Sequence, residues 1–143
     1  MDAKTYLRNP KRILGGIVRL QERIENLRKT MLPKGVRYDR DKVQTSLEDP
    51  MIIFAVKIDQ LERELLDKQI EYDKALEEID STIARVNNDD ARTVLTKRYI
   101  GMKRWKVIEA EEFISESQVY RFHRIGVREV EKILNDMEVN TRK

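Results

Sequence analysis

The feature that most constrains this fold is a pair of long apolar repeats whose spacings alternate mainly between three and four residues. The first repeat comprises Ile13, Ile17, Leu20, Ile24, Leu27 and Met31. The second comprises Phe54, Ile58, Leu61, Leu65, Tyr72, Leu76, Ile79, Ile83 and Val86. Such spacings place the apolar side chains in one stripe along a helix, as in coiled coils. We therefore expect two long helices that bury their stripes against each other.

Helix signals predict where these two helices begin and end. Asn9-Pro10 and Asp49-Pro50 each combine a capping side chain with a proline that suits a first helical turn. The first helix should stop before Pro33, and the second should continue to about Asn87, with a polar connector over residues 33–49 between them. Gly15 and Gly16 lie inside the first helix, where they mark either a close backbone approach or a weak first turn.

Charge is distributed unevenly along the two repeats. Residues 1–42 hold 12 Lys and Arg against 5 Asp and Glu, and residues 59–80 hold 3 against 9. Opposite charges favour an antiparallel hairpin of the two helices. The second helix is the longer one, so its stripe from Leu76 to Val86 must be covered by a second copy or by the C-terminal helices. We expect a homodimer.

Composition excludes several classes of protein. The chain has no cysteine and a single histidine, His123, so a disulfide scaffold, a thiolate metal site and a histidine-rich metal site are not expected. No cofactor and no enzymatic activity are indicated. Apolar runs are too short to span a bilayer, and the N-terminus lacks the apolar run of a signal peptide, so we expect a cytoplasmic protein without a membrane partner.

The last third of the chain changes to short helices. Asp89-Asp90 should cap one with Ala91, Val94, Leu95 and Tyr99 inward; a second from about Trp105 should turn Trp105, Ile108 and Phe113 inward. Ser115 should cap a helix over about 117–136, with Val119, Phe122, Gly126, Val130, Ile133 and Met137 on its apolar side. This order is typical of a helix-turn-helix. The predicted chain is all-α, with a helical hairpin over 1–88 and a DNA-binding module over 89–143.

Three segments of this module carry a family resemblance: Leu95-Thr96-Lys97-Arg98-Tyr99-Ile100-Gly101, Trp105-Lys106-Val107-Ile108 and Ser115-Glu116-Ser117-Gln118-Val119-Tyr120-Arg121. They resemble region four of bacterial sigma factors, which reads the −35 element. The tryptophan and the string Val119 to His123 resemble more closely the ArpU- and RinA-like late-gene regulators of phages. The resemblance covers roughly residues 85–135. The chain departs from the pattern at Glu109 and Glu112, and at Phe113, where the turn often has glycine.

The module and the resemblance together imply a set of DNA-contacting residues. At the start of the recognition helix these are Glu116, Ser117, Gln118, Tyr120, Arg121 and Arg124. Lys103, Arg104 and Lys106 are expected to anchor phosphates. Trp105 is expected in the core, His123 in packing or hydrogen bonding, and the acids Glu109, Glu111 and Glu112 on a solvated face.

The expected function is that of a sequence-specific DNA-binding transcription regulator, encoded by a phage or prophage. Its partners would be double-stranded DNA and a second copy of the chain; contact with the host RNA polymerase is left open. One alternative is a small terminase-like DNA-packaging protein, which also joins such a motif to an oligomerising helical part. The other is a coiled-coil adaptor that binds RNA polymerase or another protein.

Overall fold

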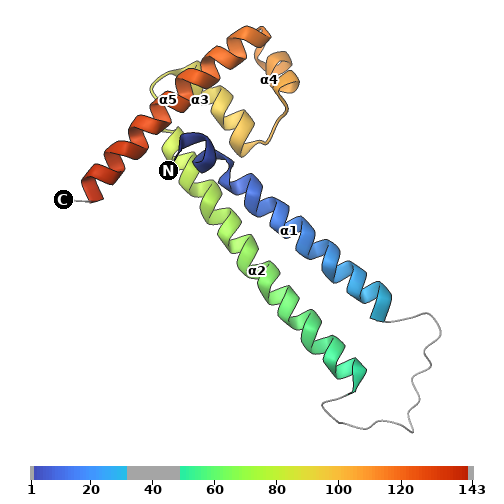
Figure 1. Ribbon diagram of the computed structural model, residues 1–143. Helices are drawn as coiled ribbons and strands as arrows, with labels where there is room; N and C mark the ends of the chain where they lie inside the picture. Colours follow the sequence, from blue (N-terminus) through green and yellow to red (C-terminus); the bar gives the residue numbers. More distant parts are fainter. Residues whose placement is uncertain (1, 32–48, 142–143) are drawn as a thin grey trace. The chain divides into compact units, whose positions relative to one another are not determined.

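The structure, a computed structural model, describes residues 2–31 and 49–141, and these residues form helices and no strand (Figure 1). The elements in chain order are α1 (Ala3–Met31), α2 (Pro50–Ile83), α3 (Asp89–Leu95), the π-helix η2 (Thr96–Ile100), α4 (Trp105–Glu112) and α5 (Glu116–Thr141). The all-α prediction is confirmed. Nearly all of the predicted connector over 33–49 lies outside the described residues.

The chain divides into two compact units that do not follow the predicted boundary at residue 88. One unit contains Met1–Arg12 and Tyr72–Lys143, and the other contains Ile13–Glu71. Helices α1 and α2 therefore each contribute to both units. The N-terminal turns belong with the short C-terminal helices, which are distant in sequence.

In the unit of residues 13–71, the parts of α1 and α2 lie side by side and run in opposite directions (Figure 1). Ile13, Ile17, Ile24 and Leu61 from the two predicted stripes are buried. An ion pair joins Arg28 of α1 to Glu62 of α2. The apolar repeat thus identified the inward-facing side chains of this unit.

Helix α1 begins at Ala3, seven residues before the predicted start at Pro10, which lies inside the helix and is buried. Proline lacks the N–H that would bond to the carbonyl four residues earlier, so it is costly at this position. The added turns bury Ala3, Tyr6 and Leu7. The Tyr6 hydroxyl is also 2.8 Å from Thr82 Oγ1 of α2. Burial of these side chains explains why the helix continues through the proline.

The core of the other unit combines α1 with the end of α2 and the C-terminal helices. Its buried residues are Ala3, Tyr6, Leu7, Ile79, Ile83, Val86, Ala91, Leu95, Tyr99 and Val130. The stripe at the end of α2 is therefore covered within the chain. Of the two alternatives considered from the sequence, a second copy or the C-terminal helices, the structure has the C-terminal helices, together with the first turns of α1. This stripe no longer supports the expected homodimer.

Candidate nucleic-acid interface

Helix α3 supplies the base on which the C-terminal helices pack. Its N-terminal cap is Asn88, whose Oδ1 accepts a hydrogen bond of 3.0 Å from the Ala91 N–H. Asp89 and Asp90, the predicted caps, lie instead in its first turn, where their charge suits the helix dipole. Ala91, Val94 and Leu95 are buried as predicted.

The chain leaves α3 through the π-helix η2 and a tight reversal at Gly101. The Gly101 N–H donates to the Thr96 carbonyl at 2.9 Å, and the Lys103 N–H donates to the Lys97 carbonyl at 3.0 Å. A Cβ at Gly101 would lie only 2.9 Å from the Lys97 carbonyl oxygen, so this approach requires glycine. The reversal lets Arg98 donate to the Lys103 carbonyl and stack 4.4 Å above the Trp105 ring.

Helix α4 ends at Glu112, and the capping residue that follows, Phe113, adopts the left-handed conformation with φ 55° and ψ 42°. Glycine commonly occupies this position because a Cβ makes the conformation costly. The side chain of Phe113 is 93% exposed. The prediction that it faces inward is wrong, because the left-handed turn carries the residue off the apolar side of α4, where Ile108 is buried.

A reciprocal cap begins helix α5. Ser115 Oγ accepts from the Gln118 N–H at 3.3 Å, and Gln118 Oε1 accepts from the Ser115 N–H at 3.1 Å. This is a capping box, and it confirms the predicted cap at Ser115. The side-chain oxygen of Gln118 is consequently engaged with the backbone of its own helix.

The inner side of α5 packs as the sequence predicts over its first half. Val119 is buried with Val94 and Ile108, and Gly126 faces Leu95 so closely that a Cβ there would be 2.7 Å from Leu95 Cδ1. Met137 is exposed, contrary to prediction, because its part of α5 extends past the core, whose last packed side chains are Ile133 and Leu134.

The predicted recognition residues lie on the exposed part of the same helix. Glu116, Ser117, Gln118, Tyr120, Arg121 and Arg124 are all exposed. The Tyr120 ring packs against the Trp105 ring in a tilted arrangement, with 5.4 Å between ring centroids. Side chains three or four residues apart share one face of a helix, so Ser117, Arg121 and Arg124 lie together, away from buried Val119 and Gly126.

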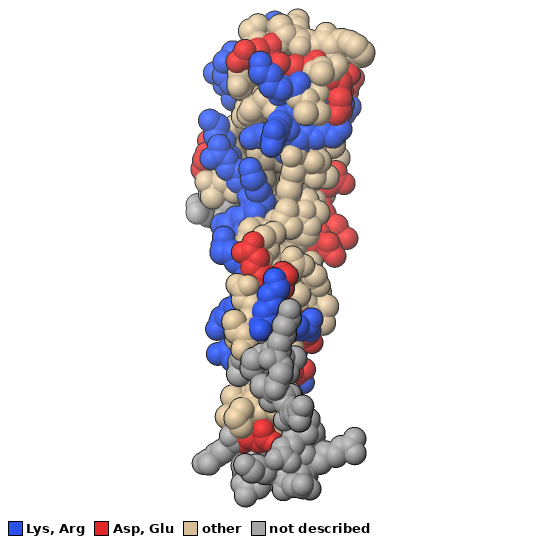
Figure 2. All heavy atoms as spheres, turned by 90° about the vertical axis from the view of Figure 1, so that its right-hand side faces the viewer, with Lys and Arg blue, Asp and Glu red and all other residues tan. Residues whose placement is uncertain are grey.

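The three predicted phosphate-anchoring residues differ in their surroundings. Lys103 Nζ lies 2.5 and 2.7 Å from the two carboxylate oxygens of Glu111, and Lys97 Nζ lies 2.6 Å from Glu112 and 3.0 Å from Glu111. These bonds raise the pKa of Lys97 and lower the pKa of Glu111. Glu111 and Glu112 are therefore ion-paired and not merely solvated. Basic and acidic atoms also lie close together on the face drawn in Figure 2.

Arg104 and Lys106 are exposed, with no acidic partner among the described residues.

His123 takes part in an aromatic cluster behind the recognition face. Its Nε2 is 2.7 Å from the Tyr99 hydroxyl, and its ring meets Trp105 edge-on with 4.9 Å between centroids. Burial, together with the nearby cations Lys4, Arg98 and Arg8, lowers the pKa of His123 to about 4. The ring is therefore neutral at pH 7. Packing and hydrogen bonding were the roles expected for it.

Among residues 2–31 and 49–141, no three potential metal-ligating side chains are grouped in a way that could hold an ion. In the same ranges, no helix is both long and apolar enough to cross a membrane.

Comparison with known families places the chain. A family model described as "Protein of unknown function (DUF1492)" matches residues 24–131, which is most of the chain. The chain belongs to the DUF1492 family. The DUF1492 match includes all of α2, α3, η2 and α4 and the first part of α5. No curated protein and no solved structure matches the chain.

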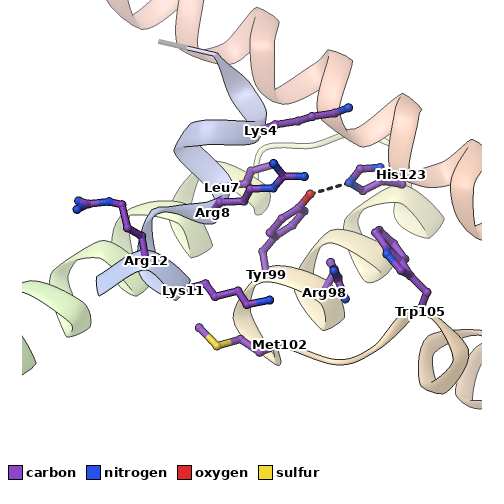
Figure 3. A pocket seen from close by; sticks show the side chains of 10 residues that line it. All are labelled: Lys4, Leu7, Arg8, Lys11, Arg12, Arg98, Tyr99, Met102, Trp105 and His123. Carbon is purple, nitrogen blue, oxygen red and sulfur yellow. Dashed lines mark hydrogen bonds between the residues drawn. The ribbon is translucent and has the colours of Figure 1, made fainter. Parts of the chain in front are cut away.

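Sequence reasoning missed one group of cations in this DUF1492 chain. Lys4, Arg8, Lys11 and Arg12 of α1 line the same pocket as Arg98 (Figure 3). The excess of basic residues over 1–42 is the sequence signal for them, but that excess also predicts attraction between the two long helices and does not locate a pocket. Their placement depends on α1 starting at Ala3, which the sequence signals did not predict.

Proposed function

We propose that this chain is a sequence-specific DNA-binding transcription regulator, encoded by a phage or prophage, in which α4 and α5 act as a helix-turn-helix. The observation that carries the proposal is the two-sided character of α5. Its inner side packs on α3 and α4, while its first turns present Ser117, Arg121 and Arg124 to solvent. A recognition helix needs this combination of a fixed position and a free polar face.

The dimensions of this face suit DNA. An α-helix with its side chains is about 10–12 Å across, which fits the roughly 12 Å width of the major groove. Arginine can donate two hydrogen bonds to guanine, which supports Arg121 and Arg124 as the base-reading side chains. Gln118 would have to leave its capping box before it could pair with adenine, so we rank it below the two arginines.

The phosphate contacts follow from which cations have acidic partners. Arg104 and Lys106 at the start of α4 would contact phosphates directly, because no described acid neutralises them. Lys103 would first have to leave Glu111. Binding in this proposal depends strongly on salt, since each phosphate contact releases counterions.

The proposal also includes pairing of two copies, so that two modules bind two half-sites. The exposed apolar side chains Ile53, Val56, Leu66 and Ile70 of α2 are candidates for this contact, in place of the buried stripe at Ile79 and Ile83. The protein would act in the cytoplasm of the host cell, where contact with RNA polymerase is a further expectation.

The test is selection of bound duplexes from a random DNA pool, followed by affinity measurements on the selected site and on unrelated DNA. Because a good base contact contributes about 1–3 kcal/mol of discrimination, Arg121→Ala should reduce the preference for the selected site roughly 5- to 150-fold. Arg128→Ala is the matched control: it removes the same charge two turns farther along α5. Unchanged site preference in Arg121→Ala would show that this face does not read bases.

Two alternatives give different results in the same experiments. The exposed apolar side chains of α2 favour a protein-binding adaptor, for which no DNA binding would be found even at low salt. A small terminase-like packaging protein would form a ring of many subunits, which sedimentation would detect.

A further inference from the structure

A pocket with a volume of about 470 Å³ lies beside the aromatic cluster, within the unit of residues 1–12 and 72–143 (Figure 3). Its size is within the range of small-molecule sites. Lys4, Arg8, Lys11 and Arg12 come from the first turns of α1, and Arg98 comes from η2. Leu7, Tyr99, Met102, Trp105 and His123 complete the lining.

The charge of this lining is entirely positive. Five of the ten lining residues are cationic, none is acidic, and the single histidine is neutral at pH 7. Lys4, Arg8 and Lys11 make no ion pair with any described acid. Arg12 donates to Asn9 Oδ1 at 2.8 Å, and Arg98 donates to a backbone carbonyl, so neither charge is neutralised. By contrast, Lys97 and Lys103, which are near Arg98 in sequence but do not line the pocket, both have carboxylate partners.

An arrangement of this kind attracts anions. Lys4, Arg8, Lys11 and Arg12 are exposed and Arg98 is half-buried, and cations gathered around a concave surface concentrate positive potential there. A phosphate group suits such a site, because arginine and lysine are its usual partners in proteins. The apolar and aromatic wall of Leu7, Tyr99 and Trp105 would flank such a group and limit its exchange with water.

We propose that this pocket binds a phosphate group, held by Lys4, Arg8 and Arg98. The phosphate has two chemical sources: the backbone of bound DNA, or a free phosphorylated small molecule. The first source rests on the proposed function, because it requires that the chain binds DNA. The geometry allows this source, because His123, which lines the pocket, lies on α5 beside Tyr120 and Arg124. The second is independent of it.

The chain carries two unique reporters on the pocket wall. Trp105 is its only tryptophan and His123 its only histidine, so fluorescence and imidazole NMR signals report on this site without assignment. The full chain is titrated with inorganic pyrophosphate, with sodium chloride of equal ionic strength as the reference. The affinity of a random-sequence duplex is measured with and without pyrophosphate.

The test variant is Lys4→Ala/Arg8→Ala, and the matched control is Arg23→Ala/Lys29→Ala, which removes the same charges from the far part of α1. Lys4 and Arg8 are exposed, so the fold should tolerate the loss of their side chains. Circular dichroism checks that the test variant remains helical. If it unfolds, Lys4→Gln/Arg8→Gln is used in its place. We expect saturable pyrophosphate binding that the test variant weakens at least 10-fold and the control leaves unchanged. Phosphate in the pocket should also raise the pKa of His123.

Competition separates the two sources. If pyrophosphate displaces the duplex, and Lys4→Ala/Arg8→Ala weakens duplex binding and flattens its salt dependence, the pocket takes a DNA phosphate. Binding of pyrophosphate without competition identifies a free phosphorylated ligand. A reduced duplex affinity of the test variant without any pyrophosphate response also supports the DNA source.

Two results overturn the proposal. One is pyrophosphate binding that the test variant does not weaken, because the anion would then bind elsewhere. The other is no response of Trp105 or His123 together with unchanged duplex affinity of the test variant. Neither result affects the proposed function, which depends on Arg121 and has its own control.

Discussion

His123 acquires its properties from its neighbours. Burial and the cations Lys4, Arg98 and Arg8 keep its ring neutral, and the ring shares a hydrogen bond with the Tyr99 hydroxyl. Burial, only partly offset by Arg8 and Arg98, also raises the pKa of Tyr99, so this pair is uncharged at pH 7. The folded chain therefore holds the imidazole in its neutral form, and protonation of His123 at low pH should cost stability.

The stability of the chain should fall as the pH is lowered from about 6.5 to about 4, the ordinary and the folded-state pKa of His123. In that window the unfolded chain takes up a proton that the folded chain does not, which favours unfolding. Above pH 6.5 the ring is neutral in both states, so His123 causes no loss of stability there. Urea unfolding at several pH values should show a steeper decline for the natural chain than for His123→Gln. Equal declines would contradict the assigned neutral ring.

Glu111 illustrates how one acid can limit the charge available for DNA. It holds Lys103 and also contacts Lys97. If the proposed function is correct, Glu111→Gln should strengthen binding to all DNA sequences and steepen the salt dependence by roughly one unit for each further phosphate that a released lysine binds. Affinities measured across a salt series test this, with Glu22→Gln in α1 as a control of equal charge. An unchanged slope would show that these lysines lie away from the phosphates.

At the level of elements, the position of α5 depends on how closely it approaches α3. Gly126 makes this approach possible, because its backbone faces the buried side chain of Leu95. Val119 and Val130, on either side of it, are also buried. The same contact therefore positions the whole proposed recognition helix.

Gly126→Ala should destabilise the chain, although alanine is the better helix former. Helix propensity favours alanine by about 1 kcal/mol, whereas overpacking costs about 1–3 kcal/mol. We expect a net loss of up to about 2 kcal/mol in urea unfolding. In a Leu95→Ala background the loss should be smaller, since the three Leu95 carbons that lie closest to Gly126 are gone. A Gly126→Ala chain more stable than the natural one would refute the close contact.

At the level of the whole molecule, the N-terminal turns belong to the unit that carries α5. Ala3, Tyr6 and Leu7 share one core with Leu95, Tyr99 and Val130. Because a core is stable only when all of its parts are present, the stability of the C-terminal helices depends on the first residues of the chain.

Leu7→Ala should therefore destabilise the unit that contains Trp105, far away in sequence, by about 2–5 kcal/mol. Thermal unfolding followed by Trp105 fluorescence measures the effect. Val18→Ala, at an exposed position of the same helix, is the control and should cost less than about 0.5 kcal/mol. If Leu7→Ala leaves the Trp105 transition unchanged, the N-terminal turns are not part of this core.

The sequence alone was sufficient for features that depend on local periodicity and capping. The apolar spacing identified the all-α class and buried side chains such as Ile17, Leu61 and Ile79, because a helix repeats every 3.6 residues whatever surrounds it. Ser115 was recognisable as a cap because its bonds lie within one turn of the chain. The exposed positions of Arg121 and Arg124 followed from the same periodicity.

Only the tertiary structure decided the features that depend on contacts between distant residues. Helix α1 continues through Pro10 because residues beyond position 78 bury Tyr6 and Leu7. Lys103 and Glu111 pair because the reversal at Gly101 brings them together. These contacts have no local signal, and the excess of basic residues over 1–42 does not show that four of them meet Arg98 beside His123. Propensities and caps describe neighbours along the chain and not those brought together by packing.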